Sequence, residues 1–171
     1  MSATDSGVRA GTHTFSWQDP TPTWQAGATM SGLEIWRAVA AGELPPPPIG
    51  EAMGLTIPVV EHGHVVFAAD AAPWMLNPLG SVHGGAIATL LDSCVGCAVH
   101  TTLPAGVGYT TLELKLSYVR AVAADAGQLR AEGTVIHAGG TVATAEGRLV
   151  AASDGRLLAH ATTTCLIMRP R

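Results

Sequence analysis

A short stretch of the chain places glycines, a histidine and a carboxylate at fixed spacing within an apolar segment. His83, Gly84 and Gly85 stand at its start, and Asp92 follows eight residues after Gly84. A lone carboxylate in an apolar helix face costs stability, and glycines weaken a helical turn. Positions where a sequence departs from its own structural logic often carry function, so this stretch is the first place to look for chemistry.

The residue types suit attack on an activated carbonyl. Free N–H groups at a helix N-terminus stabilise an oxyanion with help from the helix dipole, and Gly84 leaves the approach to its N–H open. Asp92 would activate a water as a general base or attack the carbonyl as a nucleophile, and the sequence leaves both roles open. A structural role for Asp92, capping a loop or binding a backbone amide, is the alternative.

The elements that must position these residues follow from periodicity and turn signals. A long apolar helix is predicted at about 84–100, and a shorter one, capped by Ser31, at about 31–41. Strands are predicted at about 55–61, 64–69, 111–120, 128–137, 141–152 and 156–168. Short turns between the last four strands favour antiparallel neighbours. An apolar helix beside a six-stranded antiparallel sheet must be wrapped by that sheet, which gives an α+β fold.

Three further expectations concern the flanks and the first long strand. Residues 1–28 are interpreted as a poorly ordered N-terminal arm, and residues 29–171 as a single domain. Prolines 45–48 predict a stiff, extended connector. In the strand at 111–120, alternation predicts that Leu112 shares a face with Leu114, Leu116 and Tyr118.

Composition limits the partners. Charged residues make up 13% of the 171 residues and apolar residues 47%, which favours burial of extra surface between copies of the chain. A net charge of −4 argues against a nucleic-acid or anionic-membrane partner. We see no signal peptide and no apolar run long enough to span a membrane. Three cysteines suggest no disulfide framework, and we expect a cytoplasmic protein.

The spacing within the helix limits the geometry of any site. Eight residues separate Gly84 from Asp92, so the two lie about 12 Å apart along the helix axis. They cannot both contact one carbonyl carbon. Either the motif is not a single site, or Asp92 works with Gly84 of another subunit.

Together with the strand-rich half that follows, the motif resembles that of the PaaI-like acyl-CoA thioesterases of the hotdog-fold superfamily. The matching positions are Asn77, Gly80, His83, Gly84, Gly85, Leu90 and Asp92. The resemblance covers roughly residues 30–168. It implies hydrolysis of acyl-CoA to a free acid and coenzyme A, with no metal and no organic cofactor, because coenzyme A is part of the substrate.

The resemblance also implies an assembly. Hotdog dimers pair antiparallel helices and build two composite sites. Asn77, His83 and Gly84 would come from one chain, and Asp92 and Thr111 from the other. We therefore expect a homodimer at minimum, and a homotetramer by family resemblance.

Each supporting residue keeps a structural alternative. His83 would cap the helix or orient the loop rather than exchange protons. Asn77 holds a loop turn through its side chain, or orients the attacking water or the thioester. Thr111 lies near the carboxylate, or is an ordinary strand residue, with Thr110 as the one-residue alternative.

For the coenzyme A half we assign Gly85, Arg120 and the turn of Gly139, Gly140 and Thr141. That turn would form a small anion-binding nest or serve only as a hairpin. The acyl group stays open. An apolar pocket is expected from Leu90, Leu91, Val95 and Trp74.

Other readings compete with hydrolysis. Cys94 and Cys97 match a C-x-x-C pattern, but no second pair supports a metal site, so we interpret them as small core residues. A hotdog hydratase or dehydratase is a second enzyme class, and its different motif is not found. A non-catalytic module that binds acyl thioesters is the third alternative.

Overall fold

A long helix packed against one antiparallel sheet dominates the computed structural model, which describes residues 10–170. The strands are β1 (Thr56–Glu61), β2 (His64–Asp70), β3 (Gly108–Tyr118), β4 (Gln128–Ala138), β5 (Val142–Ala151) and β6 (Leu157–Met168). The helices are α1 (Thr21–Ala26), α2 (Gly32–Ala40), α3 (Pro48–Met53) and α4 (Gly84–His100), with a 3-10 turn, η1, at Pro73–Met75.

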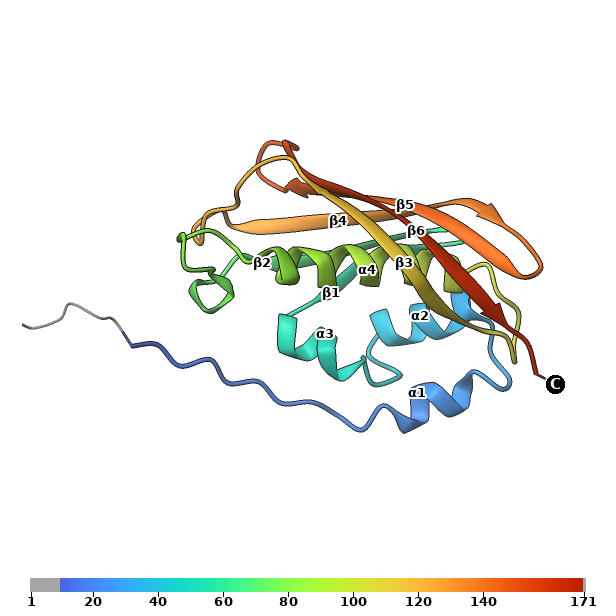
Figure 1. Ribbon diagram of the computed structural model, residues 1–171. Coiled ribbons are helices and arrows are strands. Elements are labelled where there is room, and N and C mark those ends of the chain that lie inside the picture. Colours follow the sequence, from blue (N-terminus) through green and yellow to red (C-terminus); the bar gives the residue numbers. More distant parts are fainter. Residues whose placement is uncertain (1–9, 171) are drawn as a thin grey trace, which may run out of the picture.

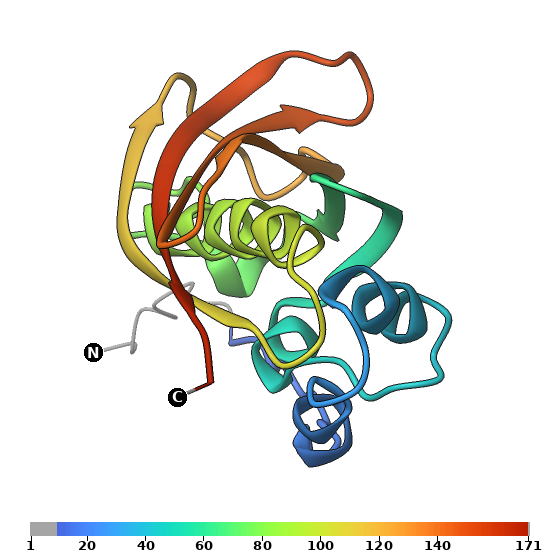
Figure 2. The same cartoon turned by 90° about the vertical axis from the view of Figure 1, so that its right-hand side faces the viewer.

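The sheet wraps the central helix. Its strand order is β1-β2-β4-β5-β6-β3, and every neighbouring pair is antiparallel. Seen from its end in Figure 2, α4 lies in the curve of the sheet, while α1, α2 and α3 lie on the helix's other side. The predicted α+β hotdog arrangement, one long helix wrapped by a six-stranded antiparallel sheet, is confirmed.

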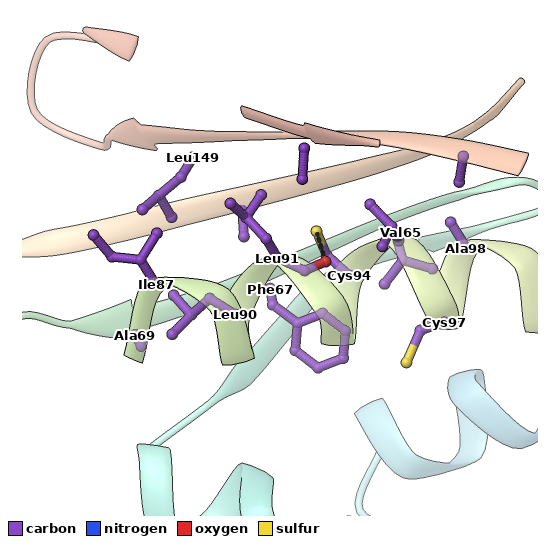
Figure 3. Close-up of a cluster of buried hydrophobic side chains, with 14 of the residues drawn as sticks. Val65, Phe67, Ala69, Ile87, Leu90, Leu91, Cys94, Cys97, Ala98 and Leu149 are labelled. Carbon is purple, nitrogen blue, oxygen red and sulfur yellow. Dashed lines mark hydrogen bonds between the residues drawn. The ribbon is translucent and has the colours of Figure 1, made fainter. Parts of the chain in front are cut away.

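The core forms where α4 meets the sheet. Leu91, Cys94 and Val95 are completely buried there, as Figure 3 shows for the first two. Gly133 and Gly147, paired across β4 and β5, let the helix approach closely. A Cβ on Gly133 would lie 2.3 Å from the carbonyl oxygen of Cys94, and one on Gly147 would lie 2.7 Å from Val95.

The N-terminal third shows where local patterns succeed and fail. Ser31 and Glu34 form the capping box that opens α2, so the predicted cap is confirmed. The predicted proline connector is one residue too long, because Pro48 begins α3, where its fixed φ suits the first turn.

The predicted arm needs a correction too. Residues 21–26 form α1, although the arm was expected to be poorly ordered throughout. Residues 1–9 lie outside the described part of the chain. The segment before α1 runs past α3 (Figure 1), where His13 stacks on Trp74 with ring centroids 4.2 Å apart. None of the helices within residues 10–170 is long and apolar enough to cross a membrane.

Candidate functional site

Asp92 and Thr111 meet between α4 and β3. The Thr111 hydroxyl donates a hydrogen bond to Oδ1 of Asp92 at 3.1 Å. Asp92 is half-buried, and its second oxygen, Oδ2, accepts no hydrogen bond from any residue in the range 10–170. The carboxylate is therefore held by one oxygen and keeps the other for a water or a substrate. Thr111, not the exposed Thr110, is the threonine beside the carboxylate.

A β-bulge aims Thr111 at Asp92. Thr111 pairs with Cys165 and Glu113 pairs with Thr164, so Leu112 is the extra residue on β3. The prediction that Leu112 shares the inner face with Leu114 is wrong: Leu112 is 57% exposed, because the bulge reverses the alternation at this point. Bulges commonly re-aim a side chain next to a functional site.

An apolar pocket of about 430 Å³ opens beside Asp92, and we call it the middle pocket. Asp92, Ser93 and Cys97 of α4 and Tyr109 and Thr111 of β3 form one wall. The opposite wall comes from α2, α3 and the first two strands, including Trp36, Ile49, Ile57 and Phe67. The pocket residues expected from the sequence do not line it: Leu90, Leu91 and Val95 are core residues, and Trp74 lies elsewhere, 42% exposed.

His83 acts as the cap of α4. Its backbone is extended, and its Nδ1 accepts a hydrogen bond from the Gly85 N–H at 2.8 Å. This satisfies one of the free donors of the first turn. The capping alternative for His83 is therefore the one that the structure supports. It also means that the Gly85 N–H is already engaged.

Gly84 contacts Tyr118, a residue that sequence reasoning did not assign to the site. The Tyr118 hydroxyl donates to the Gly84 carbonyl at 2.9 Å. A Cβ on Gly84 would lie 2.8 Å from that hydroxyl, so this packing requires glycine. The Gly84 N–H donates to no acceptor within residues 10–170, which leaves it as a free donor at the helix start.

Asn77 holds the loop that leads to the helix. Its Oδ1 accepts from the N–H groups of Leu79 at 2.8 Å and Ser81 at 3.3 Å, and its Nδ2 donates to the Ser81 hydroxyl at 2.9 Å. These bonds tie its side chain into the turn. The loop-turn role left open by the sequence is thus present.

A second pocket of about 310 Å³ lies at the helix start, and we call it the N-terminal pocket. Asn77, Gly84, Tyr118 and Arg120 line it. The motif residues therefore divide between two pockets of one chain, with Gly84 in one and Asp92 in the other. This agrees with the helical spacing, which excludes a single site built by both within one chain.

Comparison with known proteins gives the family. Residues 79–158 match the family model of the thioesterase superfamily. The phenylacetic acid degradation-related protein of Ralstonia eutropha JMP134, a candidate thioesterase, is 33% identical, with a TM-score of 0.69 over 77% of this chain and 98% of that one. The chain belongs to the thioesterase superfamily.

Two further relatives of this superfamily member bear on its function. A candidate esterase of Halobacterium salinarum is 40% identical over 77 residues, which are 44% of this chain and 49% of that protein, so the match spans about half of the relative's length. A hypothetical thioesterase protein of Streptococcus pneumoniae TIGR4, solved with coenzyme A, is 28% identical, with a TM-score of 0.62 over 68% of this chain and 88% of that one.

Arg120 and the β4–β5 turn, both expected to bind coenzyme A, lie in different surroundings in this superfamily member. Arg120 reaches the rim of the N-terminal pocket, although one of its guanidinium N–H groups donates a hydrogen bond to the carbonyl of Leu157 at 2.7 Å. In the β4–β5 turn, the Gly139 N–H donates to Val142, and neither Gly139 nor Gly140 has a positive φ. The turn is therefore a hairpin and lacks the geometry of an anion-binding nest.

The cysteines of the C-x-x-C pattern belong to the core, as predicted. Cys94 and Cys97 are buried and free. Burial raises the pKa of both thiols above their ordinary value, which disfavours the reactive thiolate. Trp36, Phe67, Tyr109 and Tyr118 were missed as pocket residues. The sequence carries no local signal for them, because they come from three elements (α2, β2 and β3) that only the fold brings to the two pockets.

Proposed function

We propose that this chain hydrolyses acyl-CoA thioesters to a free acid and coenzyme A. The observation that carries the proposal is Asp92, held by Thr111 at the wall of an apolar pocket. Membership of the thioesterase superfamily and a relative that binds coenzyme A support the same reaction. An apolar pocket with one free carboxylate oxygen suits an acyl group that ends in a reactive carbonyl.

The chemistry needs a nucleophile and an oxyanion site. As a general base, Asp92 takes a proton from water while the water oxygen attacks the thioester carbonyl carbon. The resulting oxyanion collapses, the C–S bond breaks, and the coenzyme A thiolate takes up the proton. As a nucleophile, Asp92 attacks the carbonyl carbon and expels the coenzyme A thiolate as the C–S bond breaks, and water then cleaves the resulting acyl anhydride to the free acid and the Asp92 carboxylate. Thr111 fixes the carboxylate in either route, and the proposal leaves the choice open.

The oxyanion donor would come from a second copy of the chain. The free Gly84 N–H is the donor in question, and it lies in the N-terminal pocket, away from Asp92. A homodimer with antiparallel α4 helices would bring the N-terminal pocket of one copy to the middle pocket of the other. We extend this to two composite sites per dimer and to a tetramer of two dimers.

Arg120 is the cation proposed for the coenzyme A phosphates, because it is exposed at the rim of the N-terminal pocket. For Gly85 and for the turn at Gly139, Gly140 and Thr141, we propose only that their backbone lies near the bound coenzyme A. We place the reaction in the cytoplasm, where free cysteines such as Cys165 stay reduced.

Thiol release from a panel of acyl-CoA substrates tests the reaction. We expect release by the wild type, and a loss of at least about 100-fold in kcat for Asp92→Ala, the magnitude of general-base catalysis. Asp92→Asn, which keeps the shape but not the charge, should lose as much. His160→Ala, an exposed change on β6, is the control and should keep full rate.

Three outcomes would overturn the proposal. Near-normal turnover in folded Asp92→Ala would remove the carboxylate from the mechanism. Addition of water to an enoyl-CoA without thiol release would point to a hydratase instead. Binding of acyl-CoA without any reaction would point to a binding module.

A further inference from the structure

The middle pocket exists because one face of α4 carries small side chains. Ser93, Gly96, Cys97 and His100 follow the spacing i, i+3, i+4 and i+7, so they share a face of the helix. Figure 3 shows the Cys97 side chain pointing away from Cys94, toward α2. The first three residues of this face are small, and Ser93 and Cys97 line the pocket. His100, one turn further on, is the first bulky side chain.

Trp36 of α2 stands at the same end of the pocket. Its Nε1–H donates to Nδ1 of His100 at 3.0 Å, and the two rings meet edge to face, with centroids 6.3 Å apart. Phe67 of β2 also meets the indole edge to face, with ring centroids 6.1 Å apart. The indole is therefore held by two ring contacts and one hydrogen bond, and only 8% of the residue is exposed.

His100 contacts the wall and not the pocket itself. Its ring packs against Tyr109, with centroids 5.3 Å apart, and it is absent from the pocket lining. Indole is only a donor, so the bond requires an unprotonated Nδ1 on His100. Burial lowers the pKa of His100, which favours that neutral form.

We propose that Trp36 closes the far end of the acyl pocket and limits the length of the acyl group, and that His100 is the positioning residue that holds the indole there. This inference rests on the proposed acyl-CoA hydrolysis. Asp92 marks the reacting end, and His100 lies eight residues further along α4, about 12 Å along its axis. Apolar acyl groups that end before the indole fit, whereas a long chain must displace it.

Selectivity between acyl lengths tests the proposal. The kcat/KM values for hexanoyl-, octanoyl- and palmitoyl-CoA are compared in the wild type, His100→Ala, His100→Asn and Trp36→Phe. We expect the wild type to prefer octanoyl- over palmitoyl-CoA. His100→Ala should lower that ratio roughly three- to tenfold, as expected for losing one hydrogen bond, mainly through the KM for palmitoyl-CoA. Hexanoyl-CoA turnover should stay unchanged.

The matched variants separate positioning from general loosening. His100→Asn offers an acceptor near the position of Nδ1 and should recover most of the wild-type ratio. Trp36→Phe lacks the donor and should relax selectivity by itself, and His100→Ala should then add little in the double variant. His160→Ala serves as the surface control. An equal loss for all three substrates, or no recovery in His100→Asn, would overturn the positioning role.

A binding measurement keeps this test independent of turnover. Calorimetry with octanoate and palmitate measures binding in the pocket even if the protein hydrolyses none of the thioesters. The absence of hydrolysis would reject only the proposed function. His100→Ala should then gain affinity for palmitate relative to octanoate. An unchanged ratio in folded His100→Ala and in Trp36→Phe would overturn the role of the indole as the end wall.

Discussion

Tyr118, the last residue of β3, donates a hydrogen bond to the carbonyl of Gly84, the first residue of α4, at 2.9 Å. Seven residues earlier on the same strand, Thr111 donates to Asp92 in the third turn of that helix. One edge strand thus contacts α4 beside both pockets. Strand β3 therefore fixes the position of the carboxylate and also that of the helix start.

Gly84→Ala is predicted to destabilise the fold. The new Cβ would lie 2.8 Å from the Tyr118 hydroxyl, so the ring or the helix start must move. We expect a loss of about 1 kcal/mol in the free energy of unfolding, measured by urea denaturation, because displacing the exposed Tyr118 ring breaks its hydrogen bond to Gly84. Gly140→Ala, whose Cβ would meet nothing within 4 Å, is the control. Equal stability of the two variants would mean that Tyr118 does not restrict position 84.

Thr111→Val is predicted to lower kcat with little change in stability. Valine keeps the branched shape on β3 but cannot donate to Asp92. A hydrogen bond to a charged group contributes about 1.5–3 kcal/mol, so we expect kcat to fall by roughly tenfold or more. Thr111→Ser retains the hydroxyl and should keep most of the rate. Full activity in Thr111→Val would show that the carboxylate needs no such support.

Mixing two inactive variants should restore activity if the site is composite. Asp92→Ala lacks the carboxylate, and Gly84→Ala keeps its N–H but places a methyl group on the open approach to that oxyanion donor. A heterodimer of the two contains one site with both wild-type residues. In an equal mixture half of the dimers are heterodimers, and each has one complete site of two. We therefore expect the activity of the mixture to rise after subunit exchange, toward a quarter of that of the same amount of wild-type protein. Exchange confirmed by mass spectrometry with no gain in rate would argue against a shared site.

Protonation of His100 is predicted to lower the stability of the fold at acidic pH. Burial lowers the pKa of this histidine from its ordinary value of 6.5, so the unfolded chain binds the proton more readily than the folded one. The stabilisation is therefore present above about pH 6.5 and is lost as the pH falls toward the folded-state pKa. Protonation of Nδ1 would also remove the acceptor for Trp36.

The measurement is the urea midpoint of the wild type and of His100→Asn between pH 7.5 and pH 5. We expect the wild type to lose stability more steeply, by up to about 1.4 kcal/mol for each pH unit within the window. Parallel curves for the two proteins would show that another group dominates the pH dependence.

Much of the fold could be predicted because its signals are local. The apolar run of α4 begins and ends at residues 84 and 100, as periodicity indicates, and Ser31 with Glu34 defines the start of α2. The turn residues predict the ends of the last four strands to within about three residues of their observed bounds. The short helices α1 and α3 were missed, since few residues and adjacent prolines give a weak pattern.

By itself, the sequence determined the helix, the six strands and the separation of Gly84 from Asp92, because each depends on spacing along the chain. Only the tertiary structure decided that Leu112 bulges outward and that Tyr118 covers Gly84. It also decided that Trp36 meets His100, 64 residues away. These contacts depend on strand register and on the packing of separate elements, which no local pattern encodes.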